Sequence, residues 1–564
     1  MSLYRSLKRQ RRDAPLSTEG INNQMWRQQR RNEFLEDDDE TSVNALTHPV
    51  ILNKIFGFLD TETLHSVRLV CLLWAETATS FLGRQGRLTL TTESQPPQPS
   101  TPGELSFSQK LIKETTLYMD CICPTATDIC HCPFTGLESN TSLASKFGTL
   151  WSPTRHKRLT TLNFTIRKTF NPCLHEILKT YHFPSLKSVT IIADTVNLDE
   201  DDDLAPVVQD MGPFQPLEGL KLLNFWIDPS HDVRFLGAYL SSLCQGLVNV
   251  APNLEKLDLV ANFYPDLTPC EKLDEVEFAF VEFKDFCTKD VIRLDAAEVK
   301  RMLESCDSLQ QLTLNYHPCD KSVVVPIKVD FVLPNLVHLT ITAADVYRIE
   351  DSLNTTNLPE LTHLSVSFYR CRDLSVMAAY QHAHHDGITV FHVGCTTHVE
   401  SSDENGHSAV KLDNNFPAVD EFKLKLRMRL GDNVEHDFRT LKEAMESLGG
   451  WRLKSGQVDV QFVGYQTNGI DLYEVFASKV MIAMLDGLKG WKGLSNTSLR
   501  FFSYRSGAEF KLTDGMRDAL LACRTIGNVA IEGFQMRVET DKDFDSFIGE
   551  NNLKIKSNNR TWVE

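Results

Sequence analysis

One spacing of apolar residues recurs from about residue 116 to the C-terminus. A proline is followed by apolar side chains two, five and seven positions later, and the first of these positions returns every 25 to 34 residues in most cases. Wider gaps follow Leu254 and Val419, where we expect a degenerate copy or an insertion. The copies with a proline are Pro184 with Leu186, Val189 and Ile191; Pro252 with Leu254, Leu257 and Leu259; Pro334 with Leu336, Leu339 and Ile341; Pro359 with Leu361, Leu364 and Val366; and Pro417 with Val419, Phe422 and Leu424. Looser copies begin at Leu159, Leu220, Leu309, Ile388, Leu499 and Ile526.

Helical patterns lie between these copies and complete a repeating unit of helix, turn and short strand. Neither element can bury its apolar face alone, so stacked units are expected to form one parallel sheet backed by helices. We therefore predict an α/β solenoid over residues 116–564 and expect Leu254, Leu257 and Leu259 to point into a continuous core. A doubly wound α/β domain is the alternative, since it also alternates strands and helices. The helical patterns are Leu174-Ile177-Leu178-Tyr181, Val299-Met302-Leu303-Cys306 and Met516-Ala519-Leu520-Cys523.

The L-x-x-L-x-L core of these copies resembles leucine-rich repeats of the longer, helix-backed kind. The Asn or Cys that usually closes that family's repeat is mostly missing here, so the resemblance implies an irregular solenoid. Residues after about Gly431 are less regular, and we expect them to continue as degenerate repeats. The resemblance implies an extended face that binds proteins.

A short apolar unit precedes the repeats, over residues 45–88. A first helix is expected to begin at Pro49, with Asp60 able to cap the next helix, near Leu64–Val70; a third follows over Cys71–Phe81. Two apolar stripes follow the first helix at i, i+4, i+7 spacing. We expect one stripe to pack within the unit and the other to face a partner, because so small a unit buries little of its surface. The internal stripe is Ile51, Ile55 and Phe58, and the partner stripe is Leu52, Phe56 and Leu59.

The residues of this unit resemble the F-box family. The match rests on Pro49, the aliphatic pair Ile51-Leu52, Ile55-Phe56, Leu59, Leu64, Val70-Cys71 and Trp74. The resemblance implies that this three-helix unit binds the Skp-type adaptor of a cullin-RING ubiquitin ligase, while the repeats hold a protein substrate. A helical cap on the solenoid is the alternative. The residues that the resemblance assigns to adaptor binding are Pro49, Leu52, Ile55, Phe56, Leu59, Val70, Cys71 and Trp74.

Composition narrows the possible partners. The formal net charge of −17 argues against nucleic-acid binding, and no uninterrupted apolar run approaches the roughly 18 residues of a membrane helix. Fourteen cysteines without a preceding signal peptide suggest reduced thiols in the cytoplasm or nucleus. Cys121, Cys123, Cys130 and Cys132 are closely grouped, but C-x-C spacing is poor for a zinc site, so we expect unpaired loop cysteines rather than a metal site, with zinc binding as the alternative.

Two polar segments flank the apolar unit. Residues 1–44 carry basic and acidic clusters and few apolar side chains, so we expect a disordered arm. Residues 89–115 include a Pro-rich stretch and are expected to form a linker. The contiguous acids of Asp199–Asp203 suggest a solvated loop rather than a calcium site, whose carboxylates are spaced around a glycine turn.

No catalytic motif is present. The sequence contains no phosphate-binding glycine loop, no G-x-S-x-G and no H-E-x-x-H, and the histidines between His382 and His398 lack the spacing of metal ligands. We therefore expect a non-catalytic substrate-recognition subunit of an SCF-type ubiquitin ligase, without a cofactor. A leucine-rich-repeat scaffold without a ligase role is the main alternative, and an enzyme with an unrecognised site is a third.

Overall fold

The computed structural model of the chain contains two compact units, residues 1–86 and 87–564, which are described separately. The described residues are 48–85, 87–90, 114–119, 157, 159–167, 172–194, 213–228, 237–284, 291–318, 326–371, 380, 382–398, 412–429, 442, 445–446, 449–463, 471–492, 496–503, 509–510, 512–532, 535–536, 538–558 and 561–562. The predicted arm, the cysteine group Cys121–Cys132, the acidic run Asp199–Asp203 and residues 91–113 of the predicted linker lie outside these ranges.

Within its described residues, 48–85, the first unit contains three helices: α3 (Pro49–Phe56), α4 (Thr61–Val67) and α5 (Leu72–Gln85). Helix α3 begins at Pro49 as predicted, because a proline ring suits the first turn, where the backbone N–H has no partner in the helix. Asp60 caps α4, and its carboxylate accepts a hydrogen bond from the Thr63 N–H at 2.8 Å. Those Thr63 hydrogen bonds lower the pKa of the Asp60 carboxyl.

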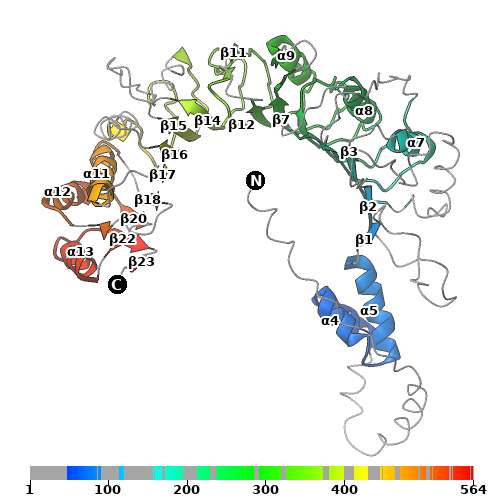
Figure 1. Cartoon of the computed structure of the whole chain (residues 1–564), viewed down its shortest axis with the longest axis horizontal. Helices are drawn as coiled ribbons and strands as arrows, with labels where there is room; N and C mark the ends of the chain where they lie inside the picture. The colour runs from blue at the N-terminus through cyan, green and yellow to red at the C-terminus, as the bar shows by residue number, and fades with distance from the viewer. Residues whose placement is uncertain are drawn as a thin grey trace, which may run out of the picture. The chain divides into compact units, whose positions relative to one another are not determined.

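Among the described residues, the second unit is built on one sheet of sixteen strands, and every neighbouring pair in it is parallel. The strand order follows the chain order from β1 to β22 (Figure 1). In order the strands are β1 (Arg87–Leu90), β2 (Glu114–Met119), β3 (Thr161–Arg167), β4 (Ser188–Asp194), β5 (Leu222–Ile227), β6 (Lys256–Ala261), β7 (Glu275–Val281), β10 (Gln311–His317), β12 (His338–Ile341), β14 (His363–Cys371), β15 (Val390–His398), β16 (Glu421–Arg429), β17 (Ser455–Val463), β18 (Asn496–Ser503), β20 (Asn528–Glu532) and β22 (Ile555–Asn558).

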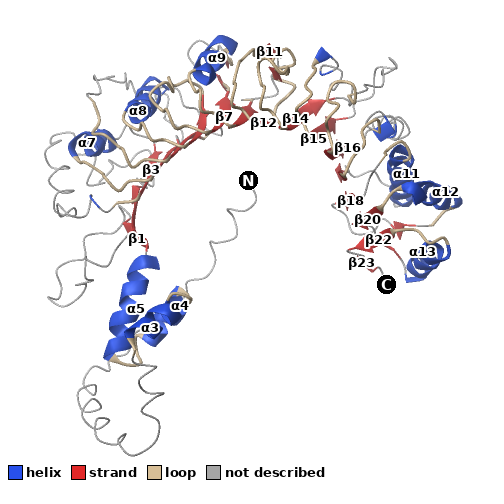
Figure 2. Ribbon diagram, turned by 180° about the vertical axis from the view of Figure 1, so that it is seen from behind, coloured by secondary structure: helices blue, strands red, loops and turns tan. Residues whose placement is uncertain are grey.

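The described helices of the second unit lie on one face of this sheet, which we call the helix face (Figure 2). They are α7 (Pro172–Thr180), α8 (Gly237–Asn249), α9 (Ala296–Glu304), α11 (Asp471–Leu488), α12 (Asp514–Ala522) and α13 (Val538–Glu550), with the short 3-10 helix η3 (Cys523–Thr525). Three small sheets pair β8 (Phe283–Lys284) with β9 (Val291–Ile292), β11 (Ile327–Lys328) with β13 (Tyr347–Arg348), and β19 (Glu509–Phe510) with β21 (Gln535–Met536) and β23 (Thr561–Trp562).

This arrangement is α/β, with a large parallel sheet backed by helices, and is compatible with a solenoid. A doubly wound domain reverses its strand order and covers both faces of its sheet, whereas here the order never reverses and the described helices share one face. The predicted helical patterns form α7, α9 and α12. The chain after Gly431 continues the same sheet through β17, β18, β20 and β22.

The core lies between the sheet and the helices. Leu254, Leu257 and Leu259 are fully buried, which confirms the prediction for this copy. Along β6, Leu257, Leu259 and Ala261 alternate with partly exposed residues, because successive strand side chains point to opposite faces. The same alternation in neighbouring strands gives one continuous apolar core on the helix face.

The two wide gaps in the repeat pattern each contain a strand. Strand β7 fills the first gap with Leu273, Val276 and Phe278, which have the expected spacing but no proline. Strand β17 fills the second, where Gly456 replaces the middle apolar residue between Leu453 and Val458. Both gaps therefore hold degenerate copies.

The sheet begins earlier than predicted. Strands β1 and β2 pair in parallel, with Leu90 opposite Leu117, so the first paired residue is Arg87 rather than about 116. Leu90 and Glu114, at the two ends of the predicted linker, therefore belong to strands. Their short apolar alternation is too weak a pattern to separate them from a polar linker by sequence alone.

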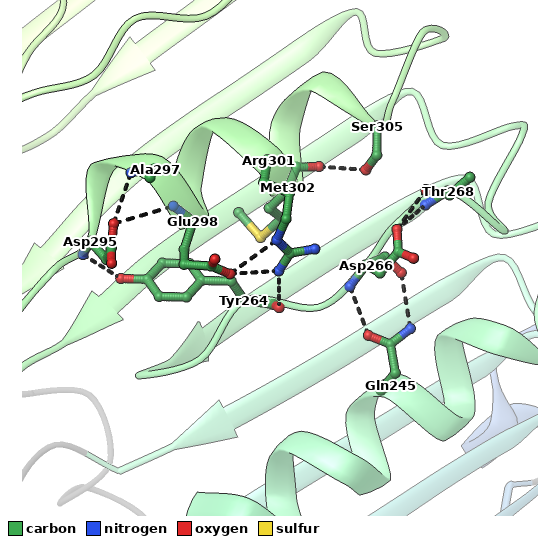
Figure 3. Close-up of polar contacts among 10 residues, drawn as sticks. All are labelled: Gln245, Tyr264, Asp266, Thr268, Asp295, Ala297, Glu298, Arg301, Met302 and Ser305. Carbon is green, nitrogen blue, oxygen red and sulfur yellow. Dashed lines mark hydrogen bonds and ion pairs between the residues drawn. The ribbon is translucent and has the colours of Figure 1, made fainter.

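Polar side chains tie successive repeats together behind the sheet (Figure 3). Gln245 on α8 exchanges two hydrogen bonds with the Asp266 backbone, at 3.0 and 2.7 Å. Arg301 on α9 donates to the Tyr264 carbonyl at 3.0 Å, and the Tyr264 hydroxyl accepts from the Asp295 N–H at 2.8 Å. The first three bonds satisfy backbone groups of the loop after β6, and the fourth joins that loop to the N-terminal end of α9.

Candidate interaction surface

The core of the first unit forms where α3 packs on α5. Leu52 and Phe56 of α3 are buried, with exposed fractions of 0 and 1%. The Phe56 ring meets Trp74 edge to face at a centroid distance of 5.5 Å and meets Phe81 in the same way at 6.4 Å. Edge-to-face contacts of this kind add to the free energy gained by burying the rings.

A second side of α3, about 100° round the helix from Leu52 and Phe56, is apolar and exposed. Ile51 and Ile55 are 40 and 43% exposed, and Phe58, in the turn after the helix, is 91% exposed. The turn between α4 and α5 adds Leu69 and Val70, and the first residue of α5 adds Leu72; all three are exposed as well. Seven of the nine exposed large hydrophobic residues in the described part of the chain thus lie between residues 50 and 72. We call this set the apolar surface: Val50, Ile51, Ile55, Phe58, Leu69, Val70 and Leu72.

The assignment of the two stripes was therefore wrong. Leu52 and Phe56, expected to face a partner, form the core, while Ile51, Ile55 and Phe58, expected inside, are exposed. The physical reason is the position of Trp74 and Phe81 on α5, which gives the Leu52 and Phe56 stripe an aromatic surface to pack on.

The other predicted adaptor-binding residues divide between the surface and the edge of the core. Pro49, Ile55, Val70 and Cys71 are exposed. Leu59 and Trp74 are partly buried against the core cluster. Sequence reasoning missed Val50, Leu69 and Leu72 and placed Ile51 and Phe58 inside; the signal that could have found Leu69 and Leu72 is that they flank Val70-Cys71 in one apolar run.

A second candidate surface is the face of the large sheet opposite its helices, which we call the open face. In the described residues it is mostly polar, and one side chain from each strand aligns in a lateral row through the strand register. From β4 to β16 this row contains Thr190, Asn224, Asp258, Glu277, Thr313, Thr340, Ser365, His392 and Lys423.

Burial shifts the titration of several groups on the open face. It raises the pKa of the Asp258 carboxyl, and the negative charge of the neighbouring Glu277 raises that pKa further. A hydrogen bond from Trp226 acts in the opposite direction and lowers it. Burial also lowers the pKa of His363 and of His392. Both imidazoles are therefore predominantly neutral at pH 7.

Two of the histidines that sequence analysis singled out already have partners within the chain. His385 is buried, accepts a hydrogen bond from the Gly387 N–H at Nδ1 (3.1 Å) and donates from Nε2 to the Leu358 carbonyl (2.7 Å), so both ring nitrogens are used. His384 is exposed and lies 3.1 Å from the Asp386 carboxylate. Within the described ranges, no three His, Cys, Asp or Glu side chains gather as metal ligands.

The described cysteines differ in state. Cys71 is free and exposed, whereas Cys244, Cys270, Cys306 and Cys523 are free and buried. Burial raises the pKa of Cys306 to about 11. Cys395 on β15 is disulfide-bonded, which departs from the expectation that the cysteines are reduced.

Comparison with known protein families finds no family that matches this chain, and comparison with characterised proteins finds no matching sequence. In the part of the chain that the structure describes, none of the helices is both long and apolar enough to cross a membrane.

Proposed function

We propose that the chain is the substrate-recognition subunit of an SCF-type cullin-RING ubiquitin ligase. The observation that carries this proposal is the apolar surface, a set of seven exposed hydrophobic residues on a three-helix unit whose sequence resembles the F-box. Exposed apolar residues gathered in this way are typical of protein interaction sites. In this proposal the apolar surface binds the Skp-type adaptor.

Phe58 is the proposed anchor of this contact. Its side chain is 91% exposed, so an adaptor pocket could bury almost all of it. Burying a phenylalanine fully is worth about 1.5–3 kcal/mol, and binding energy concentrates in such anchors. Ile51, Ile55 and Val70 then complete the apolar contact around it.

The second unit is proposed to act as a leucine-rich-repeat-like solenoid that holds the protein substrate. The support is its long parallel sheet, whose open face presents aligned polar side chains rather than a buried layer. Stacked repeats use such extended faces for binding. In this role the chain contributes binding alone, uses no cofactor, and leaves catalysis to other ligase subunits.

The test is binding of purified Skp-type adaptor to the full chain, measured by calorimetry. Phe58→Asp is expected to weaken binding at least about tenfold, because the complex would bury a carboxylate without a partner. Val332→Asp is the matched control, because Val332 is also an exposed apolar residue, 48% exposed, but belongs to the second unit. This control should bind the adaptor as the parent chain does.

Two results would reject the proposal. If the parent chain does not bind the adaptor, the scaffold without a ligase role replaces it. If Phe58→Asp binds as tightly as the parent, the apolar surface is not the adaptor site. Circular dichroism of each variant should match that of the parent, since both substituted positions are exposed.

A further inference from the structure

The open face carries opposite charges at two separated places. Asp258 on β6 lies directly opposite Glu277 on β7 in the strand register, which places two carboxylates side by side. On β16, Lys423, Lys425 and Arg427 alternate with buried residues and therefore share the open face. A straight register row runs from Glu277 through β10, β12, β14 and β15 to Lys423.

The acidic end has an aromatic neighbour. Trp226 on β5 is 47% exposed and hydrogen-bonds to Asp258. Lys256, the nearby cation on this face, makes its ion pair with Glu275 at 2.5 Å and makes none with Asp258 or Glu277, which it attracts more weakly. An exposed indole beside two carboxylates suits a lysine or arginine side chain, through charge and through cation–π attraction.

The basic end holds three cations, and its acidic neighbours are Glu421 on the same strand and Asp459, which lies opposite Lys425 in the register. Lys425 and Arg427 are exposed, and neither they nor Lys423 make an ion pair or hydrogen bond with a described residue. Three unpaired cations on one strand stand out in a chain with a net charge of −17. They suit an acidic group on a partner.

The stretch between the two ends is polar and uncharged at pH 7. The row there contributes Thr313, Thr340, Ser365 and His392, whose hydroxyl and imidazole groups can bond to a partner's backbone. Five strand steps separate β7 from β16, so the ends lie about 24 Å apart along the sheet at about 4.8 Å per step. An extended peptide covers that length with about seven residues.

We propose that the open face between β5 and β16 binds an extended protein segment with a basic residue at one end and an acidic residue at the other, about seven residues apart. The basic residue lies at Trp226, Asp258 and Glu277, and the acidic residue at Lys423, Lys425 and Arg427. That this segment belongs to a ubiquitination substrate rests on the proposed function, whereas the binding itself does not. A nucleic acid fits poorly, because the carboxylates of Asp258 and Glu277 repel a polyanion that lies along the row.

The probe is a fluorescein-labelled synthetic peptide with an Arg-Arg end, a spacer of about seven uncharged residues and a Glu-Glu end. Its affinity for the full chain is measured by fluorescence anisotropy at low salt, because salt screens exposed charges. We expect it to bind roughly tenfold more tightly than a peptide of the same composition whose charged pairs are adjacent. Equal affinities for the two peptides would overturn the proposal, as would tighter binding of a single-stranded oligonucleotide of similar length.

Charge reversal tests the basic end. The double variant Lys423→Glu, Lys425→Glu should bind the spaced peptide roughly tenfold more weakly than the parent chain does. A peptide with Lys-Lys in place of Glu-Glu should recover that loss of affinity. Lys300→Glu, on α9 of the helix face, is the matched control and should leave the affinity unchanged. A loss that Lys-Lys does not recover, or an equal loss in the control, would contradict the proposal.

The test separates this inference from the proposed function. The double variant should still bind the Skp-type adaptor, because its substitutions lie in the second unit. If the adaptor binds and the spaced peptide shows no preference, only the inference fails. If the spaced peptide binds as expected and the adaptor does not, the open-face site stands and the ligase role fails.

Discussion

Phe56 meets Trp74 edge to face, with their ring planes at 78° and their centroids 5.5 Å apart. This contact decides which side of α3 is inside, because a helix that turns Phe56 toward α5 must turn Ile55 and Phe58 away from it. The exposed stripe is therefore a consequence of aromatic packing in the core.

The contact between Phe56 and Trp74 predicts that substituting Phe56 lowers the stability of the first unit much more than substituting Phe58 does. Phe56→Ala should destabilise the first unit by about 3–5 kcal/mol, because it empties a buried site. Phe58→Ala should change its stability by less than about 0.5 kcal/mol, because that side chain is exposed. Hydrogen exchange of the amides in α3 and α5 measures both changes in the full chain. Faster exchange in Phe58→Ala than in Phe56→Ala would show that the stripes are assigned incorrectly.

The sheet core predicts a large effect at Leu257 and a small one on the open face. Leu257→Ala should cost about 2–5 kcal/mol of unfolding free energy, the usual range for a fully buried leucine. Thr313→Ala, on the open face of β10, serves as the comparison and should cost less than about 1 kcal/mol. Urea denaturation followed by circular dichroism checks both, and equal midpoints would place Leu257 outside the core.

The N-terminal cap of α9 predicts a smaller loss of unfolding free energy than the Leu257 substitution causes. The Asp295 side chain accepts a hydrogen bond from the Ala297 N–H at 2.8 Å. Asp295→Ala should cost about 1 kcal/mol, and Asp295→Asn should restore most of it, because asparagine also caps helices well. Urea midpoints of the two variants measure the difference. An asparagine variant as unstable as the alanine variant would exclude a capping role.

The stacked imidazoles of His338 and His363 on the open face predict that the stability of the chain depends on pH. His338 and His363 stack with ring centroids 4.1 Å apart, and His392 and Glu421 are the other titrating neighbours of His363. Burial lowers the pKa of His363, and repulsion from His338 and His392 lowers it further, despite an opposing effect of Glu421. Below about pH 6.5 the folded chain then binds fewer protons at His363 than the unfolded chain does. The contribution of neutral His363 to the free energy of unfolding is therefore complete above that pH and is lost as pH falls through the lowered pKa.

The melting temperature is measured at pH 7.5 and at pH 5.5. The decrease in melting temperature from pH 7.5 to pH 5.5 should be smaller for His363→Gln than for the parent chain. His384→Gln, at an exposed histidine, should show the same drop as the parent. The prediction fails if His363→Gln keeps the full drop.

The free thiols predict selective labelling. Cys71 is exposed, whereas Cys244 is buried and its pKa is raised by that burial, so its reactive thiolate is scarce. Iodoacetamide should modify Cys71 well before Cys244, as judged by peptide mass spectrometry. Under the proposed function, bound adaptor should slow the reaction at Cys71. Unchanged labelling in the complex would place the adaptor elsewhere.

Much of the fold could be predicted from the spacing of apolar residues in the sequence. The spacing of Leu254, Leu257 and Leu259 predicted a buried strand face, and the wide gaps predicted the degenerate copies now seen in β7 and β17. The start of the sheet at Arg87 was not predicted, because β1 and β2 are short and lack the repeat's spacing. For the candidate surface, the F-box resemblance pointed to Val70 and Ile55, whereas the stripe assignment placed Ile55 inside and exchanged the roles of Phe56 and Phe58.

The sequence by itself determined periodicity: which residues of a helix or strand share a face, how often a strand returns, and where a helix begins. These are local properties, fixed by backbone geometry and by capping chemistry within a few residues. Only the tertiary structure decided which of two equally apolar stripes on α3 is buried, because that depends on where Trp74 and Phe81 of α5 lie. It also decided that Glu277 and Lys423, far apart in the chain, lie in one row of the open face, because strand register is set by packing between repeats.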